Sequence, residues 1–182
     1  MSIWNKILCI AAVSMWLVGC DNNTPLMQKV VDEDVVGVES MLAQESDIEA
    51  RNNYGWTALM HAARQGHMEL VALLLERGAL VDAEDDSGWT PMMRAAMKGH
   101  EQVVKLLLEH GADINHADNS GWTALHWAAQ RGHESILRTL HEAGANVNAK
   151  NKDGWTAQMV AQNEGNHELA NLLNRWMRNQ QP

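Results

Sequence analysis

The chain has 182 residues, of which 46% are hydrophobic and 20% charged, and its formal net charge is −9. The apolar fraction excludes a disordered chain, and the length allows one compact domain or one short stack of repeats. The acidic balance argues against sequence-independent nucleic-acid binding, because phosphates would be repelled. Both cysteines, Cys9 and Cys20, lie near the amino terminus, so the rest of the chain holds no disulfide framework and no C-x-x-C metal site.

Residues 1–19 differ from everything that follows them. Lys6 supplies one positive charge, and an apolar run over residues 7–18 is interrupted only by Ser14. The run is too short for a membrane-spanning helix but fits the hydrophobic region of a secretory signal. Residues 1–19 are therefore predicted to be a signal peptide.

The signal ends in Leu17-Val18-Gly19-Cys20, which resembles the lipobox of bacterial lipoproteins. The resemblance implies that Cys20 is lipidated, that the chain is cut before it, and that residues 20–23 form a short acylated tether. Three acyl chains exceed what stable membrane anchoring requires. Ordinary cleavage near Gly19 and an uncleaved anchor are the alternatives. Asp21 resembles the inner-membrane retention signal of enteric lipoproteins, so a periplasm-facing lipoprotein is expected, with the inner membrane slightly favoured over the outer.

Gly-Trp-Thr then occurs four times, each 33 residues after the last, beginning at Gly55, Gly88, Gly121 and Gly154. A fixed period of this length is typical of stacked repeats, in which no unit buries its apolar face alone. The units align as a first capping unit at 24–54, three central units at 55–87, 88–120 and 121–153, and a last capping unit at 154–182.

The residue pattern of each unit predicts two helices and a turn-rich connection to the next unit. In the third, Thr90 is typical of a helix N-cap, Pro91 suits the first helical position, and Gly99 ends the helix. A second helix follows, with apolar residues at helical spacing over residues 103–108, and Gly111 stops it.

This unit resembles the ankyrin repeat, whose consensus runs G-x-T-P-L-H-x-A-A-x-x-G-H, then a leucine helix and G-A-D-V-N. The third unit reads Gly88-Trp-Thr-Pro-Met-Met-Arg-Ala-Ala-Met-Lys-Gly-His and later Gly-Ala-Asp-Ile-Asn. The resemblance covers residues 24–178 and implies an all-α solenoid with β-hairpin loops, a stack of about five units. The consensus histidine, which bonds within and between units in this family, survives only as His126. Methionines replace it elsewhere, so a looser inner layer is expected.

In the ankyrin family the hairpin tips and the inner faces of the first helices line a concave groove that binds protein partners. A variable contact position follows the tip glycine, and here it is always tryptophan: Trp56, Trp89, Trp122 and Trp155. These rings could form a binding ladder or could pack on their own and neighbouring hairpins. The next groove position holds His61, Arg94, Trp127 and Val160. Arg94 and Trp127 are the best candidate anchors, although each could be a tolerated, half-exposed residue.

The charge of the hairpins is uneven. Acidic residues gather in the second and third units (Asp82, Glu84, Asp85, Asp86, Asp113, Asp118), and Lys150 and Lys152 lie in the fourth. This distribution favours a partner carrying a basic patch, although an ordinary solvated face is an equally good interpretation.

Chemistry-bearing motifs are missing from the sequence. His67, His100 and His133 recur with the repeat, so their spacing does not indicate a metal site, and no H-E-x-x-H is present. There is no phosphate-binding glycine loop and no G-x-S-x-G. Neither a catalytic residue, a metal ligand, a cofactor nor a small-molecule substrate is predicted, and the protein is not expected to be an enzyme.

The sequence therefore predicts a membrane-anchored periplasmic adaptor that binds an envelope protein through its concave groove. Two alternatives stay open: an immunity-like inhibitor of a periplasmic toxin or hydrolase, and a metal-binding or stress-defence accessory protein.

Overall fold

The computed structural model describes residues 22–179. The predicted signal peptide at 1–19, the lipidation residue Cys20 and Asp21 lie outside the described residues. Within residues 22–179, no helix combines the length and apolar character needed to cross a membrane.

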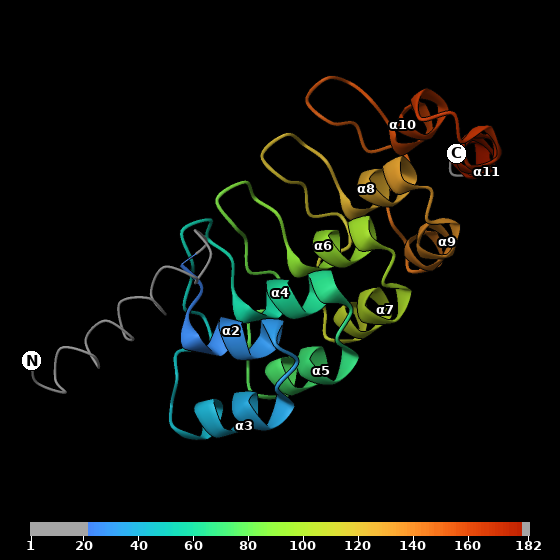
Figure 1. Ribbon diagram of the computed structural model, residues 1–182. Coiled ribbons are helices and arrows are strands. Elements are labelled where there is room, and N and C mark those ends of the chain that lie inside the picture. The colour runs from blue at the N-terminus through green and yellow to red at the C-terminus, as the bar shows by residue number, and fades with distance from the viewer. Residues whose placement is uncertain (1–21, 180–182) are drawn as a thin grey trace, which may run out of the picture.

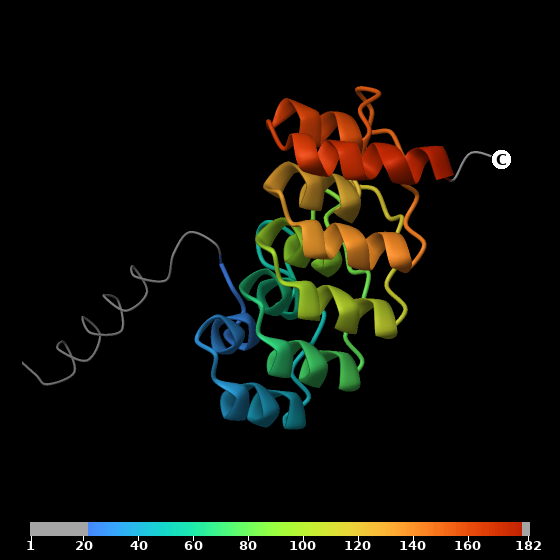
Figure 2. The same ribbon diagram turned by 90° about the vertical axis from the view of Figure 1, so that its right-hand side faces the viewer.

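Ten helices make up the described part of the chain and stack as five pairs (Figure 1). The first helices of the pairs contact one another in an inner row, and the second helices form an outer row, seen face-on in Figure 2. The expected all-helical repeat solenoid is confirmed. The inner row consists of α2 (Pro25–Val31), α4 (Ala58–Gln65), α6 (Pro91–Lys98), α8 (Ala124–Arg131) and α10 (Ala157–Asn163). The outer row consists of α3 (Val35–Ala43), α5 (Met68–Glu76), α7 (Glu101–Glu109), α9 (Glu134–Glu142) and α11 (His167–Asn179).

The helix ends follow the capping residues of the sequence. In the third unit the Thr90 hydroxyl accepts a hydrogen bond from the backbone N–H of Met93 at 3.4 Å, and Pro91 is the first residue of α6. Gly99 ends α6 in the left-handed region, at φ 87°. Because each unit carries the same threonine and most carry the same glycine, the inner helices begin and end in register.

The core runs through the whole stack as one cluster. Small residues such as Ala95 and Ala96, both fully buried, allow the inner helices to pack closely, and the apolar faces of the outer helices cover them. Met60 and Met93 replace the consensus histidine and are also buried. Met159 holds the same position in α10, but 46% of it is exposed, and α10 is the last inner helix of the described residues, packed on α8 and α11.

The connections between units do not form strands. No β-strand is present in residues 22–179, so the expected β-hairpin detail is not confirmed. The tip at residues 85–89 shows the reason: it closes with two backbone bonds, from Asp85 N–H to the Trp89 carbonyl (3.0 Å) and from Gly88 N–H to the Asp85 carbonyl (2.8 Å). One further bond joins it to the next tip, from Asn119 N–H to the Ser87 carbonyl at 3.0 Å. These bonds make a chain of linked tight turns instead of a ladder.

Candidate protein-interaction groove

A buried side chain organises each tip. Asp85 is 6% exposed, and its Oδ1 accepts hydrogen bonds from the backbone N–H groups of Ser87 (2.8 Å) and Trp89 (3.0 Å). Such bonds fix a turn locally. Sequence reasoning missed this role, although an Asn or Asp recurs three residues before each Gly-Trp-Thr. The equivalent residues Asn52, Asp118 and Asn151 make the same pair of bonds.

This role changes the surface charge that the sequence predicted for the tips. Asp85 and Asp118 were counted among the acidic surface residues, but both are buried and bonded to their own turns. Glu84 and Asp86 stay exposed beside Asp85, and Glu84 lies 3.7 Å from His116. The tips are therefore acidic, but less so than the composition indicates.

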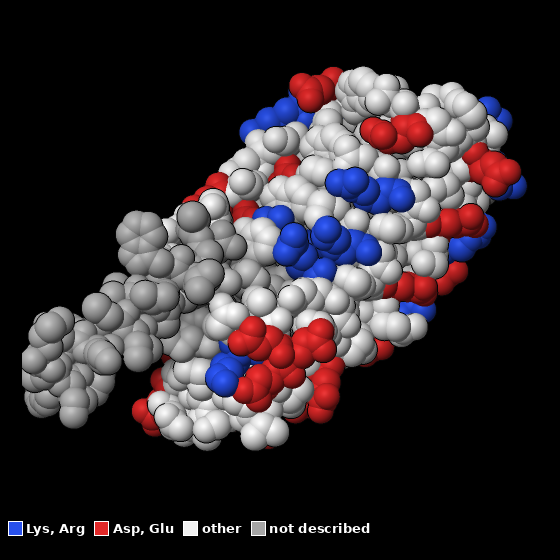
Figure 3. Space-filling view, in the orientation of Figure 1, with Lys and Arg blue, Asp and Glu red and all other residues white. Residues whose placement is uncertain are grey.

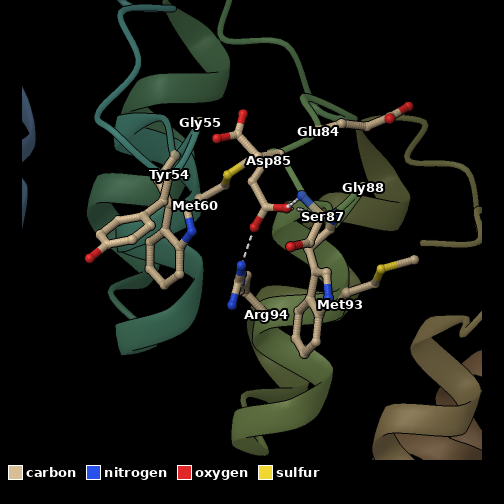
Figure 4. A network of polar contacts seen from close by, with 12 residues as sticks. Tyr54, Gly55, Met60, Glu84, Asp85, Ser87, Gly88, Met93 and Arg94 are labelled. Atoms are coloured by element: carbon tan, nitrogen blue, oxygen red, sulfur yellow. Dashed lines mark hydrogen bonds and ion pairs between the residues drawn. The ribbon is translucent and has the colours of Figure 1, made fainter. Parts of the chain in front are cut away.

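Arg94 extends from α6 to the tip that precedes it. Its guanidinium forms an ion pair with Oδ2 of Asp85 (Figure 4), and only 12% of the Arg94 side chain is exposed. The guanidinium carbon lies 4.0 Å from the ring centroid of Trp56 and 4.3 Å from that of Trp89, which are cation–π distances. Burial lowers the pKa of Arg94, and the charge of Asp85 opposes that shift. Arginine keeps its charge in such a setting.

Trp127 fills the next gap in the same way. Its ring centroid lies 4.1 Å from that of Trp89 and 4.4 Å from that of Trp122. Trp56, Arg94, Trp89, Trp127 and Trp122 thus form one continuous series of contacts, called here the tryptophan–arginine stack. Arg94 of α6 thus lies between Trp56 and Trp89, and Trp127 of α8 lies between Trp89 and Trp122. The Trp127 indole nitrogen is buried without a hydrogen-bond partner among the described residues.

The other predicted groove residues are also largely buried. His61 is 7% exposed and lies beside Trp56, with ring centroids 5.0 Å apart, and Val160 is 3% exposed. At this position His61, Arg94 and Trp127 contact tip tryptophans, and all four residues leave little surface for a partner.

His126 bridges two units, as the family resemblance implies. Its Nδ1 accepts from the backbone N–H of Thr123 at 3.2 Å, so Nε2 carries the proton and donates to the Trp155 carbonyl at 3.1 Å. His126 is fully buried, and burial lowers its pKa. The neutral ring therefore fixes the backbone of the last tip.

Large apolar side chains are exposed at the two ends of the row of tips. Trp155 is 39% exposed and contacts no other ring among the described residues, and Met159 on α10 is 46% exposed. Tyr54, 52% exposed, borders a hollow between its own tip and the tip that contains Asp85. Sequence reasoning placed Trp155 with the other tryptophans and missed Tyr54 and Met159. The hollow is lined by Tyr54, Trp56, Asp85, Asp86, Ser87 and Arg94.

Cations gather over the inner helices. Figure 3 shows Lys and Arg side chains over α4, α6 and α8, and these helices contain Arg64, Arg94, Lys98 and Arg131. Arg64, Lys98 and Arg131 are exposed, and within residues 22–179 none of the three forms an ion pair.

Two of the three recurring histidines contact the backbone of the preceding unit, and the Nε2 of the third, His67, lies 3.2 Å from the Glu33 carboxylate. His100 Nε2 lies 3.0 Å from the Arg64 carbonyl, and His133 Nε2 lies 3.2 Å from the Met97 carbonyl. Across the described range, no three His, Cys, Asp or Glu side chains are grouped so that they could hold a metal ion.

Comparison with known proteins points to one family. The family described as "Ankyrin repeats (3 copies)" matches residues 6–85, 26–118, 80–151 and 116–178. A mitochondrial disaggregase of Bos taurus is 33% identical over 88 residues, which are 42% of this chain and 13% of the relative. An "Ankyrin repeat, SAM and basic leucine zipper domain-containing protein 1" of Loxodonta africana is 37% identical over 59 residues, 32% of this chain and 12% of the relative. An "Ankyrin repeat and SAM domain-containing protein 6" of Mus musculus is 39% identical over 64 residues, 35% of this chain and 7% of the relative.

This chain spans 13% or less of the length of each of these relatives, so the similarity concerns the repeats and not the whole proteins. Ankyrin repeats are typically non-enzymatic modules, and their presence indicates a role in protein–protein interaction. The matched repeats and the stacked helix pairs together show that the chain belongs to the ankyrin-repeat family.

Proposed function

We propose that this protein is a membrane-anchored periplasmic adaptor that binds an envelope protein through the groove between its tips and its inner helices. One observation carries the binding part of the proposal. Trp155, Met159 and Tyr54 expose large apolar surfaces at the ends of a groove whose other aromatic residues are used in packing. Exposed tryptophan and tyrosine are typical of interface anchors, because they bury a large area and still offer a polar atom.

The membrane part of the proposal depends on the sequence before the first helix. Leu17-Val18-Gly19-Cys20 resembles a lipobox, and Asp21 favours the inner membrane. Asp21 to Thr24 would extend roughly 14 Å, at about 3.5 Å per residue. The repeat stack would then lie close to the bilayer, so its partner is proposed to be at or near the same membrane.

The tips supply an orienting charge. Glu84, Asp86 and Asp153 are exposed along this edge and favour a partner with basic residues there. Exposed charges of this kind mainly affect the rate and orientation of association, and their effect weakens with salt.

The anchor is tested with Cys20→Ser. The native protein should incorporate labelled palmitate and sediment with membranes, whereas Cys20→Ser should do neither. Equal labelling and sedimentation of both forms would refute lipidation at this residue.

The groove is tested by identifying proteins that co-purify after mild in-cell cross-linking and detergent extraction. The groove variant is Trp155→Ala with Met159→Ser; the matched control is Val36→Ala with Met68→Ser, which removes two exposed apolar side chains from outer-row helices. Circular dichroism establishes that all forms fold. Capture of one protein by the native and control forms but not by the groove variant supports the proposal. Equal capture by all three contradicts it.

A further inference from the structure

We infer that the partner lays an acidic segment, rich in Asp or Glu, across the cations of the inner helices. This inference rests on the proposed function of the groove and specifies the chemistry of what binds there. The inner row has an unusual charge distribution. Its five helices contain five cations, namely Lys29, Arg64, Arg94, Lys98 and Arg131, and no Asp or Glu.

The outer row is different, because every one of its helices contains at least one glutamate, from Glu39 in α3 to Glu168 in α11. The whole chain has 23 acidic and 14 basic residues, so an inner row without carboxylates is a clear departure from its composition. The inner helices thus carry cations without carboxylates, although the protein as a whole is acidic, and Figure 3 shows Lys and Arg side chains gathered over them.

Three of these five cations form no ion pair within the described residues. Lys29 pairs with Asp34 and Arg94 with Asp85, whereas Arg64, Lys98 and Arg131 form no ion pair among residues 22–179. The three are exposed in the last turn of α4, α6 and α8. By contrast, Lys105 and Arg138 of the outer row pair with glutamates of their own helices.

A cation in the last turn of a helix also interacts favourably with the helix dipole. That effect explains a single Lys or Arg at one helix end. It does not explain the distribution, because the last turns of the neighbouring outer helices α5 and α7 contain no basic residue. Nor does it explain why carboxylates are missing from the whole inner row.

The spacing of the cations fits an extended peptide. Lys98 and Arg131 occupy equivalent positions of adjacent units, and packed helices lie about 8–10 Å apart. A peptide in the extended polyproline II conformation has three residues per turn and advances about 3.1 Å per residue, so every third side chain lies on the same side, about 9 Å from the last, and could reach the next cation. Arg64 in α4 lies one position earlier in its unit than Lys98 does in α6, and its guanidinium carbon lies 5.5 Å from the Trp56 ring centroid. A segment bound to the three cations would therefore also border the tryptophan–arginine stack.

The test measures binding of a fluorescent peptide to the full-length protein in mild detergent. The peptide has Glu at every third position, with Ser and Gly between; a control peptide has Gln in place of Glu. The groove variant combines Arg64→Gln, Lys98→Gln and Arg131→Gln. The matched control combines Lys150→Gln, Arg175→Gln and Arg178→Gln. These three cations are exposed, lie outside the inner row and form no ion pair among the described residues, so both variants change the net charge equally.

The native protein and the charge-matched control should bind the Glu peptide with similar affinity, and the Gln peptide more weakly. In the groove variant the affinity should fall about tenfold, because three exposed ion pairs each contribute modestly. Added salt should weaken binding of the Glu peptide to the native protein.

Three outcomes would overturn the inference: equal binding of the Glu and Gln peptides, an equal loss of affinity in both variants, or failure of the native protein to bind the Glu peptide. Vesicles of phosphatidylglycerol form a parallel arm. If they bind through the same three cations while the Glu peptide does not, the groove recognises a lipid surface and the inference is wrong. If the peptide test fails but partner capture still depends on Trp155 and Met159, the proposed function stands and only the acidic segment is rejected.

Discussion

The Asp85 carboxylate and the Arg94 guanidinium join the tip at residues 85–89 to helix α6, which follows it. One Asp85 oxygen holds the turn through two backbone N–H groups, and the other pairs with Arg94 between two indole rings. The equivalent carboxylate, Asp118, holds its turn in the same way but forms no ion pair within the described residues, because Trp127 stands where Arg94 would be. The pair thus gives one unit a charged link between tip and helix that the next unit lacks.

We predict that Asp85→Asn destabilises the protein by about 3 kcal/mol, because it leaves the Arg94 charge buried and unpaired. The turn itself should survive, since Asn52 and Asn151 make the same backbone bonds in other units. Asp118→Asn is the matched control and should cost less than about 1 kcal/mol. Urea unfolding followed by circular dichroism measures both. Equal losses in the free energy of unfolding would mean that the ion pair does not contribute to stability.

We predict that the predicted groove tryptophans differ in structural importance according to their contacts. Trp127→Ala opens a gap between Trp89 and Trp122 and should cost about 3–5 kcal/mol, as for other truncated core aromatics. Trp155→Ala removes an exposed ring without ring partners and should cost about 1 kcal/mol or less. Near-ultraviolet circular dichroism should change strongly only for Trp127→Ala. The same cost at both positions would argue against the division between packing and exposed tryptophans.

We predict a pH-dependent contribution from His126. Burial lowers its pKa in the folded protein below the ordinary value of 6.5, so on acidification the unfolded chain binds a proton that the folded protein excludes. The contribution of the neutral ring is therefore fully present above pH 6.5 and is lost as the pH falls through and below that value.

The variant His126→Met isolates this effect, because methionine is buried at the same position in the second and third units. Free energies of unfolding are measured in urea between about pH 8 and pH 5, on either side of the ordinary histidine pKa. The native protein should lose more stability than His126→Met over this range. Parallel curves would assign the pH dependence to the other histidines.

We predict that Gly99→Ala is more damaging than Gly78→Ala. Both glycines have positive φ, 87° and 89°, so both variants carry the same left-handed strain of about 1–2 kcal/mol. A Cβ at Gly99 would also lie 2.8 Å from the His133 ring, whereas one at Gly78 meets nothing within 4 Å. Gly99→Ala should therefore cost about 1–3 kcal/mol more in urea unfolding. If the two variants lose the same free energy of unfolding, the close packing of His133 on the preceding unit does not contribute to stability.

The repeat architecture could be predicted from local signals, because each one acts within its own unit. Thr90, Pro91 and Gly99 define the ends of α6 wherever the unit lies in the stack. Local signals could not decide whether the expected hairpins contain strands, because a strand depends on a ladder of hydrogen bonds between segments. The structure has tight turns there, each held by a side chain such as Asp85.

The groove was harder to predict, because exposure depends on what the neighbouring unit places beside each residue. Trp122 and Trp155 occupy equivalent positions, but the first packs against Trp127, whereas the last unit has Val160 in the place of Trp127 and Trp155 is exposed. The recurring Asn or Asp at the tips could have been found from its period alone. The carboxylate-free inner row could be recognised only once the helices had been assigned to rows.

The most direct test of the groove places a photo-crosslinking amino acid at single positions of the full-length protein in its native cells. Positions 155 and 159 lie at the exposed end of the groove, and position 36, on outer-row α3, is the control with 75% exposure. We predict that positions 155 and 159 crosslink to the same envelope protein and that position 36 does not. Crosslinks to that protein from position 36 alone, or equally from all three positions, would contradict recognition through the groove.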